Sequence, residues 1–212
     1  MDRVIVGIDE AGRGPVLGPM VVVGVSTGSR ALAKLSRLVR KNSKALSPHV
    51  REKLSWRMRP LLEGVVVKVV PPSMIDEWVL GGGRNLNSLE LNIITSIAHL
   101  LKPDELYIDS WDVKPERLRE RLEETLPGGV EIICEHGADE RYPIVGAASI
   151  IAKVLRDREI SKLSSIYGPM GSGYSSDGRT ISFLRKWYKR WGEFPPFARK
   201  SWKTLERIRK EE

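Results

Sequence analysis

Cysteine is almost absent from this chain of 212 residues, which contains Cys134 and no other. A single cysteine excludes an internal disulfide framework and any metal site built from several thiolates. Long apolar runs are also missing, since no stretch approaches the roughly 20 uninterrupted apolar residues of a membrane span. Internal repeats and low-complexity tracts are absent as well. We therefore expect a cytoplasmic globular protein, monomeric by default, in which Cys134 is an inert small hydrophobe.

Positive charge is concentrated near the C-terminus. The formal net charge is +8, and residues 179–212 hold 11 Lys or Arg against 4 acids, so the rest of the chain is close to neutral. The same segment contains seven aromatic residues. Basic side chains bind phosphates, and aromatic rings stack on bases, so the segment is a candidate nucleic-acid contact. Amphipathic helices with core-facing aromatics and solvated basic residues would give the same pattern, and the two interpretations are compatible.

Strands and helices alternate along the chain. Runs of β-branched residues predict strands at residues 3–8, 20–25, 65–70, 105–109 and 130–134. Apolar spacing and helix start and stop signals predict helices at residues 29–40, 48–62, 72–79, 87–101, 115–126, 143–167, 179–190 and 199–210. This order indicates an α/β fold with a sheet of mixed direction. A glycine-rich break at 167–176 predicts a core over 1–170 and a C-terminal helical region over 171–212, together one compact unit.

Four acidic residues stand at or just beyond the ends of predicted strands. Asp9 and Glu10 follow the first strand, Asp109 ends the fourth, and Asp139 comes after the fifth. Carboxylates at the ends of neighbouring strands converge on one edge of a sheet, where they repel unless a cation neutralises them. Oxygen ligands without a Cys/His set favour Mg²⁺ or Mn²⁺. Each acid taken singly is better explained as a strand-end cap or a surface carboxylate, and this explanation weakens when all four are considered together.

Neighbouring residues in a regular strand point to opposite faces. Asp9 and Glu10 can therefore both reach one metal site only if the backbone is kinked between them. The following residues, Ala11-Gly12-Arg13-Gly14-Pro15, make such a kink plausible.

The residues around these acids resemble type 2 ribonuclease H, the ribonuclease HII family. Two highly specific blocks carry the resemblance, Asp9-Glu10-Ala11-Gly12-Arg13-Gly14-Pro15 and Ala147-Ala148-Ser149-Ile150-Ile151-Ala152-Lys153. Shorter matches extend it over nearly the whole chain, at residues 42–47, 86–87, 107–109, 135–143, 171–174 and 177–180. The residues of the second block resemble archaeal members of this family more than bacterial ones.

The resemblance implies a fold and an activity. The fold would be a ribonuclease H-like mixed five-stranded sheet flanked by helices, with residues 1–170 as catalytic core and 171–212 as a helical substrate-binding region. The enzyme would hydrolyse the RNA strand of RNA·DNA hybrids and nick duplex DNA on the 5′ side of an embedded ribonucleotide. Two ions of Mg²⁺ or Mn²⁺ would take part, and the products would be 3′-hydroxyl and 5′-phosphate ends. Residues 205–212 show no obvious motif for docking a sliding clamp.

The resemblance also assigns roles to individual residues. The metal-holding acids would be Asp9, Glu10, Asp109 and Asp139. The residues that bind substrate would be Gly12, Arg13 and Gly14, which read the ribose, Ser43 and Lys44, which contact phosphate, and Tyr174, beside the RNA-to-DNA junction. Without the resemblance, the glycines would be interpreted as a turn and the tyrosine as a core residue.

The chain departs from the family pattern at two positions. Asn42 stands where an acid usually precedes Ser43, and Gly178 stands where proline is common. Asp177 can still cap the helix that begins near Gly178. The sequence leaves the roles of two further residues open. Lys153 is either structural or phosphate-facing, and His136 is either a structural or surface residue or a general acid or base.

Three other functions compete with this interpretation. Ribonuclease HIII resembles the same active site but carries a substrate-binding domain before the catalytic one, for which the predicted first strand leaves no room. A non-catalytic nucleic-acid-binding module on a degenerate fold would have lost at least one of the four acids. A DNA transposase or resolvase on this fold is disfavoured by Tyr174 and the Gly12–Gly14 loop, through family resemblance alone.

Overall fold

The computed structural model describes residues 3–39, 46–82 and 84–212, which form two compact units. The first unit comprises Met1–Ala11, Val21–Lys68 and Glu90–Val154. The second comprises Gly12–Met20, Val69–Leu89 and Leu155–Glu212. The C-terminal segment is thus joined in the second unit by two earlier segments. A substrate-binding role for residues 171–212 stays a prediction.

The elements follow one another as predicted, with the short helix α6 added. The strands are β1 (Ile5–Ala11), β2 (Met20–Thr27), β3 (Gly64–Val70), β4 (Glu105–Asp109) and β5 (Glu131–Glu135). The helices are α1 (Ser29–Leu38), α2 (Pro48–Met58), α3 (Pro72–Leu80), α4 (Leu86–Leu101), α5 (Pro115–Thr125), α6 (Ala138–Arg141), α7 (Pro143–Tyr167), α8 (Gly178–Trp191) and α9 (Lys203–Glu211). Among the helices seen in the described ranges, none combines the length and apolar character needed to cross a membrane.

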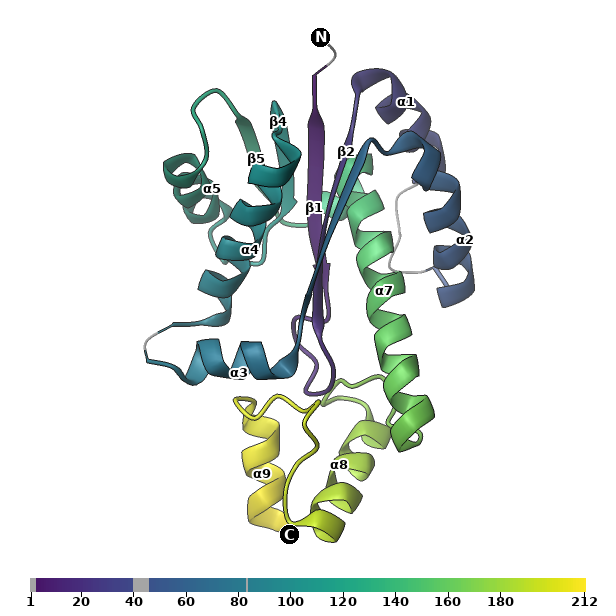
Figure 1. Cartoon of the computed structure of the whole chain (residues 1–212), viewed down its shortest axis with the longest axis vertical. Helices are drawn as coiled ribbons and strands as arrows, with labels where there is room; N and C mark the ends of the chain where they lie inside the picture. Colours follow the sequence, from purple (N-terminus) through teal and green to yellow (C-terminus); the bar gives the residue numbers. More distant parts are fainter. Residues whose placement is uncertain (1–2, 40–45, 83) are drawn as a thin grey trace. The chain divides into compact units, whose positions relative to one another are not determined.

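The strands form a mixed sheet in the order β3-β2-β1-β4-β5, with β1 in the middle (Figure 1). β1 pairs with β2 antiparallel and with β4 parallel, and β4 pairs with β5 parallel. The predicted mixed five-stranded sheet is therefore confirmed. Because β1, β4 and β5 run in the same direction, their carboxyl ends meet at one edge of the sheet.

Two glycines let helices approach the sheet closely, one on each face. A Cβ atom added to Gly7 of β1 would lie 2.5 Å from the backbone carbonyl carbon of Ile144 in α7. A Cβ atom added to Gly24 of β2 would overlap the side chain of Ile97 in α4. Gly24 pairs with the residue that follows Gly7, so the two glycines lie on opposite faces. α7 and α4 therefore cover opposite faces of the first unit's sheet, and Asp9, two residues beyond Gly7, faces α7.

Two helices differ from their predicted ranges. α9 begins at Lys203, four residues later than expected, because the preceding residues form a turn in which the backbone N–H of Trp202 donates to the carbonyl of Arg199 at 3.1 Å. α2 ends at Met58 and passes into a short 3₁₀ helix around Pro60, since proline has no N–H to continue the α-helical ladder.

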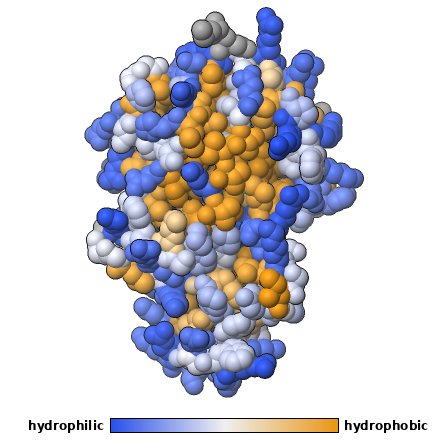
Figure 2. All heavy atoms as spheres, viewed as in Figure 1, coloured by the Kyte–Doolittle hydropathy of each residue, from blue (hydrophilic) through white to orange (hydrophobic). Residues whose placement is uncertain are grey.

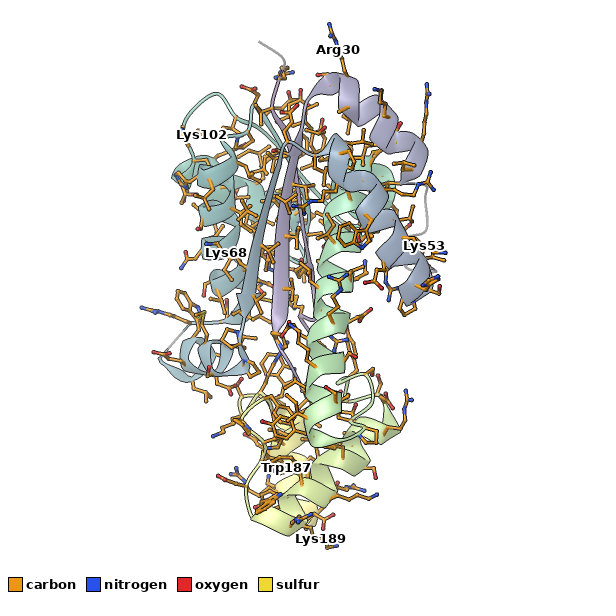
Figure 3. The ribbon with its side chains drawn as sticks, turned by 45° about the vertical axis from the view of Figure 1, so that its right-hand side comes forward. Arg30, Lys53, Lys68, Lys102, Trp187 and Lys189 are labelled. Carbon is orange, nitrogen blue, oxygen red and sulfur yellow. The ribbon has the colours of Figure 1, made fainter. Side chains whose placement is uncertain are left out.

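The second unit has an aromatic core of its own. Phe194 and Phe197 are buried beside Leu184, and the ring of Trp187 contacts the ring of Phe197 at a centroid distance of 5.8 Å. In Figure 3, Trp187 lies within this part of the chain and Lys189 lies at its outer surface. The basic residues of α8 are exposed, namely Arg179, Arg185, Lys186, Lys189 and Arg190. The aromatics other than Trp191, which is 59% exposed, therefore pack in or against this core, and the positive charge of α8 lies in solvent as an amphipathic helix predicts.

β3 is one of the two edge strands of the sheet and has an apolar, solvent-facing row of side chains. Val65 and Val67 are 39% and 38% exposed, while their neighbours along the strand are more buried. Figure 2 shows hydrophobic side chains gathered where β3 crosses the view. The alternation is that of a strand with one face toward solvent.

Cys134 lies in β5 and is a free, partly buried thiol. Burial raises the pKa of this thiol to about 12. The reactive thiolate is therefore scarce at neutral pH, which confirms the inert character expected of this residue.

The close approach of α7 to β1 predicts that Gly7→Ala destabilises the fold by about 2 kcal/mol or more, because the added methyl group meets backbone atoms that cannot move aside cheaply. Urea unfolding would measure the loss. Gly128→Ala is the matched control, since its added Cβ meets no described atom within 4 Å. It should change stability by less than about 0.5 kcal/mol. Equal stability of the two variants would contradict the packing argument.

Candidate active site

Three strand-end segments bring three aspartates together. Asp9 lies near the end of β1, and Asp109 is the last residue of β4. Ile8 and Ile108 are partners in the parallel register, so the aspartates that follow them are neighbours on the α7-covered face. Asp139 comes from α6, which follows β5 directly. The convergence predicted from strand ends is present for these three acids.

The three carboxylates are close together and largely buried. Each offers an oxygen within 4.8 Å of the others, and this is the group of potential metal ligands found among the described residues. Asp9 and Asp139 are each 5% exposed. The backbone N–H of Ala138 donates to Oδ1 of Asp109 at 3.0 Å, which fixes that carboxylate against the start of α6. Three oxygen donors at this spacing match the chemistry that Mg²⁺ and Mn²⁺ prefer.

The electrostatics of Asp9 favour a nearby cation. Burial, followed by the negative charge of Glu10, raises its pKa well above the usual range, and Asp109 adds to the rise. A hydrogen bond with Ser149 and the charge of Lys153 act in the opposite direction without cancelling it. A carboxylate that is this costly to ionise fits a divalent cation, whose attraction would offset the free-energy cost of burial and of like-charge repulsion.

α7 supplies the polar side chains that hold the acids. Nζ of Lys153 lies 3.8 Å from Oδ2 of Asp139 and donates a hydrogen bond to the hydroxyl of Ser149. Ser149 in turn hydrogen-bonds to Asp9. Lys153, which the sequence left open, thus lies beside the acids. Ser149 was not identified from the sequence, although its place one helical turn before Lys153 puts both on one face.

Glu10 and His136 stand apart from the group of three. β1 pairs with β2 in regular register through Ala11, so the kink predicted between Asp9 and Glu10 is not found in this stretch. The carboxylate of Glu10 nevertheless influences Asp9 electrostatically. His136 is exposed, and its Nδ1 lies 3.0 Å from the carbonyl of Ser110.

The glycine loop and the tyrosine lie together in the second unit. Gly12 has φ +82°, and a Cβ there would lie 2.7 Å from the carbonyl oxygen of Pro19, so glycine is required on both grounds. Nη2 of Arg13 donates to Oδ1 of Asn87 at 2.6 Å. A Cβ added to Gly14 would lie 3.9 Å from the ring of Tyr174. The second unit therefore assembles the predicted ribose-reading loop and the junction tyrosine.

Tyr174 is held from one side by a buried cation. The guanidinium of Arg156 lies 5.2 Å from the centre of the Tyr174 ring and donates to the carbonyl of Ser172 at 2.5 Å. Tyr174 is 40% exposed, whereas Arg156 is 6% exposed. One ring face is thus supported while a large part of the ring stays accessible. Arg156 was not identified from the sequence.

Two of the predicted phosphate contacts, Ser43 and Lys44, lie outside the described residues, as does Asn42. The capping role predicted for Asp177 is confirmed, because its side chain accepts from the backbone N–H of Arg179 at the start of α8. The Arg179 side chain and the backbone N–H of Ser172 hold the pKa of Asp177 far below its usual range.

Comparison with known proteins decides the family. A sequence model described as Ribonuclease HII matches residues 6–205. The chain belongs to the ribonuclease HII family. Ribonuclease HII of Thermococcus kodakarensis is 45% identical over 208 residues, which cover 96% of this chain and 89% of that protein. The resemblance drawn from the motifs is confirmed, and this member of the ribonuclease HII family is a metal-dependent endoribonuclease with ribonuclease H activity.

Solved structures agree on the fold. The ribonuclease H2 of Pyrococcus horikoshii OT3 superposes with a TM-score of 0.90 at 41% identity, covering 98% of both chains. The ribonuclease HII of Archaeoglobus fulgidus, solved in a complex with PCNA, has a TM-score of 0.87 at 43% identity, with 96% of both chains covered. Bst-RNase HIII in complex with Mn²⁺ has a TM-score of 0.82 at 19% identity, with 100% of this chain and 71% of that one covered, and shows a shared fold alone.

The repulsion at Asp9 predicts that Asp9→Asn stabilises the metal-free ribonuclease by about 1 kcal/mol at neutral pH, as removal of an unfavourable functional group often does. Because the pKa of Asp9 is raised in the folded state, wild type loses stability as pH rises through that pKa, and the gain from the variant should appear over the same rise. Urea unfolding in EDTA would measure it. Glu120→Gln, an exposed exchange on α5, is the control. A less stable Asp9→Asn would refute the interpretation.

Proposed function

We propose that Asp9, Asp109 and Asp139, together with Glu10, hold two divalent cations, Mg²⁺ or Mn²⁺, for phosphodiester hydrolysis. The proposal rests on one observation: carboxylates from β1, β4 and α6 converge within 4.8 Å in a buried site. The fourth ligand, Glu10, is proposed from the family motif and from its electrostatic influence on Asp9. A structure of the distantly related Bst-RNase HIII contains Mn²⁺, which supports the choice of metal.

We further propose that the enzyme cuts the RNA strand of RNA·DNA hybrids and nicks duplex DNA on the 5′ side of an embedded ribonucleotide. When bound, the cations would lower the pKa of the attacking water and stabilise the leaving 3′-oxygen, which gives 3′-hydroxyl and 5′-phosphate ends. The task of the protein is then to hold its acids in a fixed arrangement. Ser149 orients Asp9, the N–H of Ala138 orients Asp109, and Lys153 lies beside Asp139.

Substrate selection is assigned to the second unit. We propose that backbone amides of the Gly12–Gly14 loop approach the ribose 2′-hydroxyl closely, because Gly12 and Gly14 have no side chains to obstruct the approach. Arg13 would meet phosphate, with its guanidinium steadied by Asn87. The accessible face of Tyr174 would stack on the deoxyribose that follows the ribonucleotide, where a 2′-hydroxyl would clash. Ser43 and Lys44 remain proposed phosphate contacts.

The exposed cations of α8 and α9 extend this substrate surface. Their charge would neutralise phosphates beyond the cleavage point, in an interaction that weakens with salt. A relative was solved with PCNA, but residues 205–212 of this chain show no obvious clamp-docking motif, so a clamp partner is not part of the proposal. A monomeric state and a cytoplasmic location, expected from the sequence, stay predictions.

An end-labelled DNA duplex carrying one ribonucleotide tests this function. We expect nicking immediately 5′ of the ribonucleotide with Mg²⁺ or Mn²⁺, and none in EDTA or on an all-DNA duplex. Asp109→Asn should reduce cleavage by about 10³-fold or more, because it removes a metal ligand, while duplex binding stays measurable. Full activity of this variant would overturn the site assignment. Tight binding without any cleavage by wild type would favour a non-catalytic module.

Tyr174→Ala should lower cleavage at a single embedded ribonucleotide by about tenfold and affect a long hybrid less, since the lost ring contact acts at the RNA-to-DNA junction. Tyr174→Phe keeps the ring and is the control. Rates on the two substrates give the comparison directly. Equal losses on both would argue against a junction-reading role.

A further inference from the structure

Arg199 is a basic residue that does not face solvent. It is 0% exposed in the second unit, although it belongs to the strongly basic C-terminal segment. Its guanidinium donates to three backbone carbonyls of one loop: to Gly12 at 2.5 Å, to Arg13 at 2.6 Å and to Gly18 at 3.1 Å. One planar guanidinium group thus holds both ends of the loop at residues 12–18, which starts with the Gly12–Gly14 motif.

The residues around Arg199 bind the same loop. Its backbone N–H donates to the carbonyl of Val16 at 2.9 Å, and the N–H of Gly18 donates to the carbonyl of Phe197 at the same distance. Nε1 of Trp202 donates to the carbonyl of Gly14 at 3.0 Å. The segment 197–202 therefore engages carbonyl groups along most of the loop from residue 12 to residue 18.

The segment is itself anchored by a buried carboxylate. Asp76 in α3 is 9% exposed and accepts from the backbone N–H groups of Lys200 and Ser201 at 2.8 and 2.9 Å. It also accepts from the hydroxyl of Ser201 at 2.6 Å. The guanidinium of Arg199 lies 4.9 Å from the centre of the Trp202 ring, which limits its freedom further. Contacts outside the loop thus help to hold Arg199 in position.

The direction of these bonds has a consequence for the loop's amides. In a planar trans peptide the carbonyl and the following N–H point in opposite directions. The carbonyls of Gly12 and Arg13 point at Arg199, so the N–H groups of Arg13 and Gly14 point away from it. These are amides of the loop to which we assign ribose reading.

We propose that Arg199 is a positioning residue that sets the direction of the Arg13 and Gly14 amides and thereby the preference for ribose over deoxyribose. The inference rests on the proposed ribose-reading role of the Gly12–Gly14 loop. Lysine would not replace Arg199, because an ammonium group on a flexible chain lacks the planar fork that holds three carbonyls at once. A merely structural Arg199 would alter stability without altering this preference.

Equilibrium binding tests the proposal in the cleavage-deficient Asp109→Asn full-length chain. The readout is the ratio of affinities for a duplex with one ribonucleotide and for the same duplex made entirely of DNA. Arg199→Lys in this background should lower the ratio by about tenfold, the effect of losing about 1.4 kcal/mol of selective contact, with all-DNA affinity unchanged. Arg30→Lys, the same exchange at an exposed position of α1 labelled in Figure 3, should leave the ratio unchanged.

A milder variant guards against misfolding of Arg199→Lys. Trp202→Phe removes the donor to Gly14 and keeps an aromatic ring in place, so the ratio should fall about threefold. If both variants fold and keep the parent ratio, the positioning role is overturned, while the ribose-reading loop stands. If the parent itself shows no preference for the ribonucleotide duplex, the proposed ribose-reading role fails, and the inference fails with it.

Discussion

Repulsion between carboxylates that the fold holds together is the constraint on which the first unit depends. Asp9, Asp109 and Asp139 could separate only if β1, β4 or α6 moved, and each of these elements is tied to the sheet by backbone pairing or direct succession. The free energy of the packed core therefore holds the acids together against the cost of desolvating them and the repulsion between their like charges. A divalent cation turns this unfavourable arrangement into a binding site, which explains why the acids lie where water is scarce.

Gly7 links the packing of the sheet to the geometry of the active site. Because Gly7 has no side chain, α7 lies against β1 closely enough for Ser149 to bond Asp9 and for Lys153 to approach Asp139. A larger residue at position 7 would push these side chains outward along with the helix. Packing on one face of the sheet and the orientation of the acids are in this sense one feature.

Local patterns in the sequence predicted the elements and the convergence of acids, because strand ends, β-branched runs and caps such as Asp177 are encoded over a few residues. They did not predict α6, the late start of α9 or the roles of Ser149 and Arg156. Arg199 is the clearest case: within a basic, amphipathic-looking segment it counts as one more phosphate contact, yet it is buried. Its partners lie more than 180 positions away along the chain, and no local pattern encodes such contacts.

The high pKa of Cys134 has a practical consequence. Since the chain's one native thiol is largely protonated and partly buried, a cysteine introduced at an exposed position would react with maleimide probes far faster. Fluorophores could then be attached to either unit without removing Cys134 first. The distance between the two units, with and without nucleic acid, thereby becomes accessible to energy-transfer measurements on the otherwise natural sequence.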